Sequence, residues 1–286
     1  MSTLFRKTWK VSIDTIQTDA HDVAFQIVKT KKRQPNTCTL SIWNLSEAQR
    51  KQIEALSIPQ KTTAGTQRTG RGKIRVQVEA GLGGETSLLF RGDLRTAITV
   101  REGPDLITTI EGDDGGRDIL LARVSRSYKP GTAVRTVVRD LVTALGIGTG
   151  NLDSLNYATR AGQTFPGGTV LTGKADEILT RLLHSCGCTW SVQNGALQVL
   201  QAGAGLALSA VLLSVDNRTL VGTPSVSPEG YVQVEALMVP GIFPGARVQV
   251  KCPSLTGLYT VHNVTHSGDS MAVGPGTWTH LLECRP

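Results

Sequence analysis

Apolar and polar residues alternate along two segments in the last third of the chain. In residues 231–237, valine and alanine take every second position, with tyrosine, glutamine and glutamate between them, and residues 246–251 repeat this pattern. A period of two is typical of antiparallel strands with one buried face. Pro240 and Pro244, each beside a glycine, predict a turned connector between the two strands. We therefore expect a small barrel or sandwich whose polar face is free to meet a partner.

The first 112 residues carry the same alternation in several segments. Strands are predicted at residues 9–13, 21–29, 37–43, 73–80, 87–91, 94–101 and 106–112. One helix is predicted to begin near Asn44, because Ser46 and Gln49 form a capping box, and to stop at Pro59. Residues 60–72 are polar and lack apolar periodicity, which predicts a mobile loop. This first region is also expected to be a barrel or sandwich.

The apolar period lengthens after residue 112. A helix is predicted from residue 131 to Leu145, with Gly146 as its C-terminal cap, and a second helix from Lys174 onward. Asn194 and Gly195 lie between two strand-like runs, which is a strong hairpin signal. This middle part is expected to be a small α/β domain of two helices on a hairpin.

The chain is therefore predicted to be mainly β with a small α/β part. Two β-barrel or sandwich domains, at residues 1–116 and 205–286, are expected to flank a helix–helix–hairpin domain at residues 117–204. The 31 glycines and 12 prolines among 286 residues suit such a turn-rich β protein.

Charge and cysteine content narrow the setting in which the protein acts. The net charge of +7 is spread along the chain, except for two basic clusters in predicted connectors. These clusters contain Lys29, Lys31, Lys32 and Arg33, and Arg68, Arg71 and Lys73. Five scattered cysteines argue against a disulfide framework. No apolar run reaches the roughly 18 residues of a membrane span, and no signal peptide is recognised, so synthesis in a cytoplasm is expected.

Residues able to carry chemistry form no familiar catalytic or metal-binding motif. Cys186 and Cys188 are closer in sequence than zinc ligands usually are, and His262 and His266 are about 13 Å apart along a strand. The acidic run at residues 111–118 lacks the closing glutamate of a calcium loop, so a turn capped by aspartates and glycines is favoured. No nucleophile elbow or phosphate-binding loop is present. We expect no catalytic residue, metal or cofactor.

Short turn and strand motifs of the last third resemble those of a known family. They are Leu-Val-Gly-Thr-Pro at 220–224, Pro-Gly-Ile-Phe-Pro-Gly-Ala-Arg-Val at 240–248, Gly-Leu-Tyr-Thr-Val at 257–261, and His266 to Asp269 with Trp278 behind them. In order and spacing these motifs are similar to the C-terminal half of the baseplate hub proteins of long-tailed bacteriophages. Residues 111–118, 170–173 and 188–197 resemble the segments that precede that half. One departure is Asn217-Arg-Thr-Leu220, where the family pattern suggests a glycine before the leucine.

The resemblance implies a structural virion protein of the tail or baseplate. It implies two tail-tube-like β domains in each chain, and a homotrimer whose six β domains imitate a sixfold ring. Such a ring would join a hexameric tail tube protein to a trimeric central spike protein, with other baseplate proteins as further partners. DNA would pass through the lumen without specific binding. The basic residues 29–33 and 68–73 would then be candidate contacts to neighbouring subunits.

Two other functions remain open from the residues alone. The C-terminal β domain could bind nucleic acid or carbohydrate, with Trp278 and Tyr259 as a stacking face. A cell-wall hydrolase has no motif in its favour, and the basic loops also fit plain solvated charge.

Overall fold

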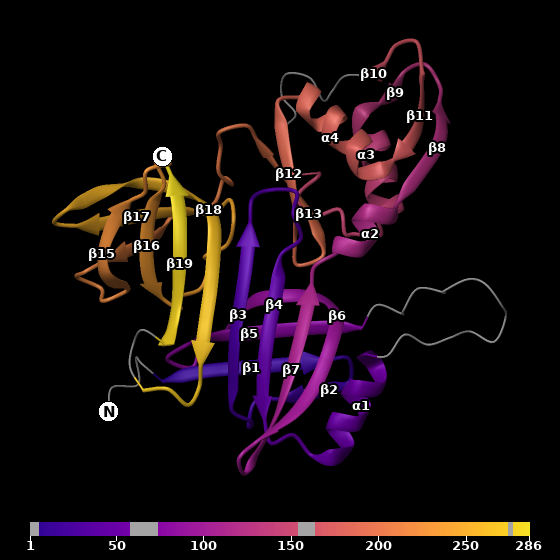
Figure 1. Ribbon diagram of the computed structural model, residues 1–286. Coiled ribbons are helices and arrows are strands. Elements are labelled where there is room, and N and C mark those ends of the chain that lie inside the picture. Colours follow the sequence, from indigo (N-terminus) through magenta and orange to yellow (C-terminus); the bar gives the residue numbers. More distant parts are fainter. Residues whose placement is uncertain (1–5, 58–73, 154–163, 274–276) are drawn as a thin grey trace.

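The computed structural model describes residues 6–57, 74–153, 164–273 and 277–286. A large sheet of 13 strands runs through the molecule, and a smaller α/β part lies at one end of it (Figure 1). We call residues 6–113 the N-terminal β region, residues 114–201 the middle region and residues 211–286 the C-terminal β region. No helix within the described ranges has the length and apolar character needed to span a membrane.

Most strands predicted for the N-terminal β region are present. Its elements are β1 (Lys7–Ile13), β2 (Ile16–Thr18), β3 (Val23–Thr30), β4 (Thr37–Trp43), α1 (Glu47–Ser57), β5 (Arg75–Leu82), β6 (Ser87–Glu102) and β7 (Asp105–Asp113). The capping box is confirmed, because the Ser46 amide donates to Gln49 Oε1 at 3.0 Å and the Gln49 amide to Ser46 Oγ at 3.3 Å. Pro59 and the predicted loop at 60–72 lie outside the described residues.

The prediction of two separate strands at 87–91 and 94–101 is wrong. Both belong to β6, which continues through Gly92. A Cβ at this position would lie 2.4 Å from the Asp113 carbonyl oxygen and 2.5 Å from the Phe90 ring. Gly92 is therefore needed because its neighbours pack closely against the backbone of a continuous strand. In a sequence, a glycine next to an aspartate usually predicts a turn, which is why two strands were expected.

The middle region contains the predicted helices and hairpin and some further strands. Its elements are α2 (Gly116–Leu121), β8 (Arg123–Tyr128), β9 (Thr132–Ala133), α3 (Val134–Ala144), β10 (Thr164–Phe165), β11 (Thr169–Lys174), α4 (Ala175–Ser185), β12 (Cys188–Gln193) and β13 (Ala196–Gln201). Asn194 and Gly195 have φ of 55° and 78°, as a two-residue hairpin turn requires. Gly146, with φ 66°, ends α3 as predicted.

The two alternating strands of the C-terminal β region, β16 and β17, do not pair with each other. Its elements are β14 (Val211–Ser214), β15 (Leu220–Val226), β16 (Val232–Leu237), β17 (Arg247–Cys252), β18 (Leu255–Asp269) and β19 (Trp278–Arg285). The alternation is confirmed, since Val232, Val234 and Ala236 are buried. However, β16 pairs with β15 and β19, whereas β17 pairs with β18 and, in parallel, with β14. The turned connector therefore crosses between non-adjacent strands.

The two β regions have the same strand order. Leaving aside the three-residue β2, which pairs with β1 at the edge, the N-terminal strands lie in the order β1-β5-β6-β7-β4-β3 across the sheet, and the C-terminal strands in the order β14-β17-β18-β19-β16-β15. In each case, counting along the chain, the first strand lies beside the fourth, and the second and third form an outer hairpin. One difference is that β1 pairs with β5 antiparallel, whereas β14 pairs with β17 in parallel.

Details of register support this correspondence. β6 skips Arg95 in its pairing with β7, and β18 skips His262 in its pairing with β19. Matching these two bulges aligns residues 75–78 with 247–250, and both segments read Arg-Val-Gln-Val. The same alignment brings two side-chain hydrogen bonds between strands into equivalent positions. Thr96 Oγ1 donates to Glu111 Oε2 at 3.0 Å, and Asn263 Nδ2 donates to Glu283 Oε2 at 2.6 Å.

The two β regions are joined by strand pairing and share buried residues. β3 pairs antiparallel with β18, with Asn263 opposite Thr30 and Asp269 opposite Ala24, and the two strands lie side by side in Figure 1. Trp278 belongs to the N-terminal core, where it packs against Trp9 and Phe25. No strand pairing among the described residues closes either region into a barrel. The strands of the two β regions therefore form one continuous sheet.

Candidate assembly site at the junction of the three regions

The basic connector after β3 lies where the three regions meet. Lys29 was expected in this connector as an exposed contact, but that prediction is wrong, since β3 extends to Thr30 and Lys29 is 1% exposed. Its ammonium donates to the Leu89 carbonyl at 3.0 Å and to Asn194 Oδ1 at 2.9 Å. Burial lowers the pKa of Lys29 to about 8, although Asp114 favours the charged form. The sequence contained the signal, because the inward alternation Val23, Phe25, Ile27 continues to this residue.

Lys31, Lys32 and Arg33 form the connector itself. Lys31 Nζ donates to the Ala204 carbonyl at 3.0 Å, so this side chain holds the linker between the middle and C-terminal regions. Arg33 lies 3.6 Å from Asp176 on α4 and donates to Thr180 at 3.3 Å. Lys32 and Arg33 are exposed. Both therefore remain accessible to a partner.

The second basic cluster cannot be placed. Arg68, Arg71 and Lys73 lie outside the described residues.

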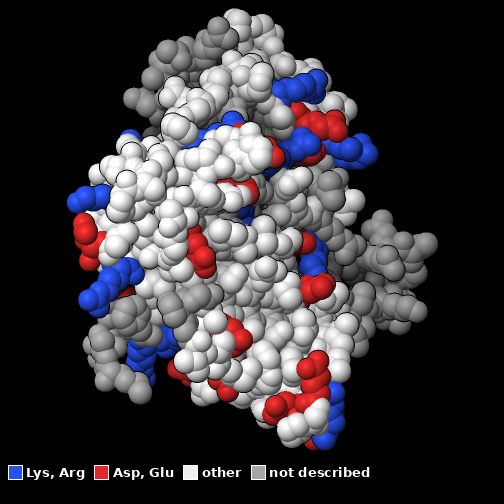
Figure 2. All heavy atoms as spheres, turned by 60° about the vertical axis from the view of Figure 1, so that its left-hand side comes forward, with Lys and Arg blue, Asp and Glu red and all other residues white. Residues whose placement is uncertain are grey.

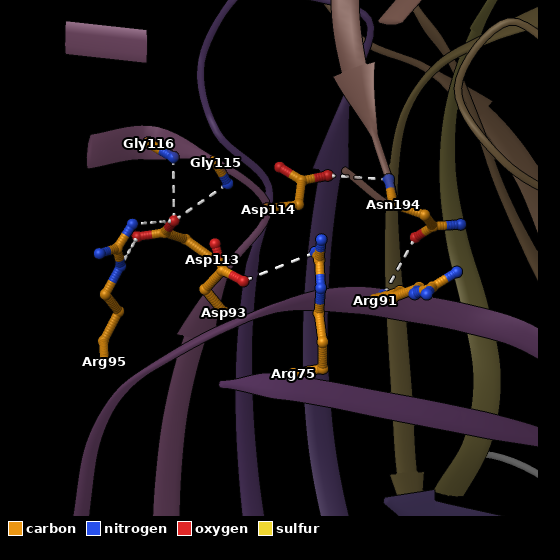
Figure 3. Close-up of polar contacts among 9 residues, drawn as sticks. All are labelled: Arg75, Arg91, Asp93, Arg95, Asp113, Asp114, Gly115, Gly116 and Asn194. Carbon is orange, nitrogen blue, oxygen red and sulfur yellow. Dashed lines mark hydrogen bonds and ion pairs between the residues drawn. The ribbon is translucent and has the colours of Figure 1, made fainter. Parts of the chain in front are cut away.

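A buried polar network anchors the middle region beneath the connector. Asp114 accepts hydrogen bonds from the Asn36 amide at 2.9 Å, from Asn36 Nδ2 at 2.6 Å and from the Asn194 amide at 3.1 Å. Figure 3 shows Asp114 facing the tip of the β12–β13 hairpin, where Asn194 also accepts from the Arg91 amide. Burial raises the pKa of Asp114 to about 6 against these hydrogen bonds and the attraction of Lys29.

The neighbouring Asp113 starts the first helix of the middle region. Arg95 binds its carboxylate in a bidentate pair, and the same carboxylate accepts from the Gly115 and Gly116 amides at 3.2 and 2.9 Å (Figure 3). These hydrogen bonds hold the pKa of Asp113 below its usual value against desolvation. The acidic run therefore caps a turn, as predicted. Within the described ranges, no three His, Cys, Asp or Glu side chains are placed to hold a metal ion.

A groove of about 440 Å³ opens between the connector and the middle region. Lys31, Lys32 and Arg33 border it, and Trp190 and Cys188 from β12 and His262 from β18 contribute to its walls. Burial and three nearby cations, Lys31, Arg285 and Lys32, lower the pKa of His262 to about 4. Elsewhere, the face seen in Figure 2 carries small groups of charged side chains separated by wide uncharged areas.

Two buried histidines contact each other, and the sequence analysis did not predict this pair. His266 Nδ1 and His280 Nδ1 are 2.7 Å apart on β18 and β19, and His280 Nε2 lies 3.0 Å from the Val239 carbonyl. Burial lowers the pKa of both rings, that of His280 to about 4. The separation of histidines along one strand gave no warning of this cross-strand contact, which depends on strand pairing.

The predicted aromatic stacking face is absent. Trp278 is 1% exposed, and its Nε1 donates to the Gly81 carbonyl at 2.9 Å. Tyr259 is 9% exposed and belongs to the C-terminal core. These rings stabilise the fold and cannot stack on a nucleic-acid base or a sugar.

A comparison with models of protein families gives a match to this chain. The family model described as baseplate hub gp41 matches residues 8–272. A comparison with curated protein sequences gives no match.

Solved structures with a similar fold include phage tail proteins and a component of a secretion system. The 43 kDa tail protein of prophage MuSo2 from Shewanella oneidensis shares 10% identity over 98% of both chains, with a TM-score of 0.62. A tail protein from Neisseria meningitidis MC58 shares 11% identity over 98% of this chain and 97% of that one, with a TM-score of 0.63. An Escherichia coli component of the type VI secretion system, described as similar to the T4 tail proteins gp27 and gp5, has 10% identity and a TM-score of 0.53, covering 96% of this chain and 76% of that one.

Proposed function

Because this chain belongs to the baseplate hub gp41 family, we propose that it is the hub subunit that joins a tail tube to a central spike. Three copies would form a ring in the virion baseplate. The family is a structural one and not an enzyme class. The proposed partners are a hexameric tail tube protein on one side and a trimeric spike protein on the other.

The repeated strand order carries this proposal. Two β regions with the same strand order, β1-β5-β6-β7-β4-β3 and β14-β17-β18-β19-β16-β15, lie in one chain and share one sheet. Three such chains would place six similar β regions around an axis. A trimer with threefold symmetry could then contact a ring with sixfold symmetry. Heterologous contacts between neighbours generate a closed ring when their rotation closes.

The three hydrophobic cores support a division at residues 1–116, 117–204 and 205–286. One core is built mainly from β1–β7, one from the middle region and one from β14–β19. Met238 and Trp278 of the last division belong to the first core. The first and last units would therefore move as one body, with the middle unit projecting from it.

Lys32 and Arg33 are the candidate contact residues from the basic connector. They are exposed beside the groove, unlike Lys29. DNA would pass such a ring without specific binding. Trp278 and Tyr259 are buried and do not offer the stacking face that binding of single strands needs. For the same reason, a nucleic-acid- or carbohydrate-binding module is the less favoured function.

Sedimentation of the purified protein over a range of concentrations tests the proposal. We expect a trimer, and negative-stain images of it should have a ring with threefold or near-sixfold symmetry. A protein that stays monomeric at high concentration and does not bind tube or spike proteins would contradict it.

A further inference from the structure

One edge of β18 is occupied twice along its length. β17 pairs with residues 255–260, and β3 pairs with residues 263–269, while β19 follows the other edge. β3 is the outermost strand of the N-terminal β region. This second pairing therefore joins one β region to the next.

Among the described strands, β5 is the only one that pairs with the corresponding edge of β6. β5 pairs with the first half of β6, up to Asp93, and β7 follows the other edge as far as Glu102. Among the described strands, none pairs with residues 96–102 on the β5 side. α1 also packs against β6, and its buried residue, Ile53, lies in the N-terminal core. Ile98 and Val100 in this half are 61% and 52% exposed.

The outer edge of β15 is likewise open in the described chain. β15 is the counterpart of β3 in the common strand order, and it ends the sheet. The registers with β4 and β16 align Ile27 with Val226. Ile27 is fully buried, whereas Val226 is 64% exposed. An apolar residue at an open strand edge is a site at which another chain can add a strand.

We propose that β15 of one copy pairs antiparallel with residues 96–102 of β6 in the next copy, as β3 pairs with β18 inside the chain. This inference rests on the proposed trimer and specifies which strands pair between neighbouring copies in it. The register of β3 and β18, in which Ile27 lies opposite His266, places Val226 opposite Thr99. Pro224 has no amide hydrogen and lies beside a register shift, so the pairing is centred on Val226.

Cysteine cross-linking tests the register. In the double variant Thr99→Cys/Val226→Cys, the two sulfurs would belong to opposed residues of neighbouring copies, at a spacing that a disulfide can bridge. Mild oxidation should give covalent dimers and trimers on a denaturing gel. Leu88→Cys/Val226→Cys is the matched control, because Leu88 lies in the first half of β6, where β5 occupies the edge. Each single variant controls for the native cysteines.

Association of charge variants gives a second, independent measurement. Val226→Asp should weaken trimer formation by about tenfold or more, because burial of a valine favours association by more than 1.4 kcal/mol. Val170→Asp is the control, since Val170 is 70% exposed on β11 and away from both edges.

The outcomes separate this inference from the proposed function. A trimer that shows no Thr99–Val226 cross-link, or that is cross-linked only through Leu88, would overturn the strand pairing and leave the hub role intact. A wild-type protein that is monomeric at every concentration would overturn the trimer, and the pairing with it.

Discussion

The two β regions have the same strand order but opposite electrostatics at their matching bulges. In the N-terminal region, Arg95 at the bulge forms an ion pair with Asp113. In the C-terminal region, His262 takes the place of Arg95, and Arg285 takes the place of Asp113. An attractive pair is thus replaced by two basic groups. Arg285 instead lies over the Tyr231 ring, 4.1 Å from its centroid.

This difference shows what the common fold constrains. The apolar alternation and the main-chain ladders are kept in both regions, because they set which strands are neighbours. The polar residues at the bulge differ with what each region contacts. Asp113 and Asp114 anchor the middle region, whereas Arg285 on β19 packs over the Tyr231 ring.

The largest predicted effect concerns Trp278, which the C-terminal region contributes to the N-terminal core. We expect Trp278→Ala to lower the free energy of unfolding by about 3–5 kcal/mol, because it leaves a large cavity beside Trp9 and Phe25. Leu106 holds the equivalent position in the N-terminal region and is only half-buried. Leu106→Ala should cost less than half as much in urea unfolding. Equal losses would contradict the asymmetry between the regions.

The next effect concerns the buried network through which the N-terminal region holds the middle region. Asp114→Ala should lower the free energy of unfolding by about 3 kcal/mol, because it leaves the Asn36 amide and side chain without their buried acceptor and removes the negative charge that favours protonated Lys29. Asp216→Ala is the control, since Asp216 pairs with Lys251 on the surface, and its loss should stay within about 0.5 kcal/mol. If Asp114→Ala lowered the free energy of unfolding as little as the control does, Asp114 would not anchor the middle region.

Acid should destabilise the C-terminal region, in part through the histidine at its bulge. The pKa of His262 is lowered from 6.5 to about 4 by burial and by Lys31, Arg285 and Lys32. The unfolded chain therefore binds more protons between these values, and stability falls as the pH drops from about 6.5 to 4.

His262→Gln should remove about 1 kcal/mol of this acid sensitivity, a value reduced for solvent screening at this half-buried ring. Unfolding midpoints measured across this pH range test the prediction. Arg95→Gln is the matched variant, and it should lower stability at neutral pH without changing the slope in this range. An unchanged slope in His262→Gln would assign the acid sensitivity to other groups.

The smallest effect concerns α1, which connects β4 to β5 and has no helical counterpart between β16 and β17. Ser46→Ala removes the cap of this helix and should cost about 1 kcal/mol. The exposed Ser209, outside any helix or strand, provides the control substitution. A loss no larger than that of Ser209→Ala in thermal unfolding would mean that α1 contributes little to the stability of the N-terminal region.

Predictions from the sequence succeeded where a few adjacent residues decide the structure. The alternation at 231–237, the capping box at Ser46 and the Asn194-Gly195 turn are local signals, and each was confirmed. The candidate site was predicted less well. Lys29 was assigned to a loop although its position in the alternation placed it inside, and the repeated Arg-Val-Gln-Val segments were not recognised as a duplication.

Local turn chemistry also explains a departure from the family pattern. Arg218 adopts φ 58°, the region that favours glycine, in the turn where the resemblance led us to expect one. Asn217 supports this turn, because its Oδ1 accepts from the Ser214 and Thr219 amides at 3.2 and 3.1 Å. The backbone requirement is thus kept while the residue differs.

Local signals in the amino-acid sequence were enough to predict the mainly β class, most strands and helices, and their turns and caps, because these depend on contacts between residues a few positions apart. The pairing of β3 with β18, the parallel pairing of β14 with β17 and the contact of His266 with His280 could be seen only in the folded molecule. Those contacts join segments up to hundreds of residues apart. Many pairings satisfy the same alternation, and the choice among them depends on how all the strands bury their apolar faces together.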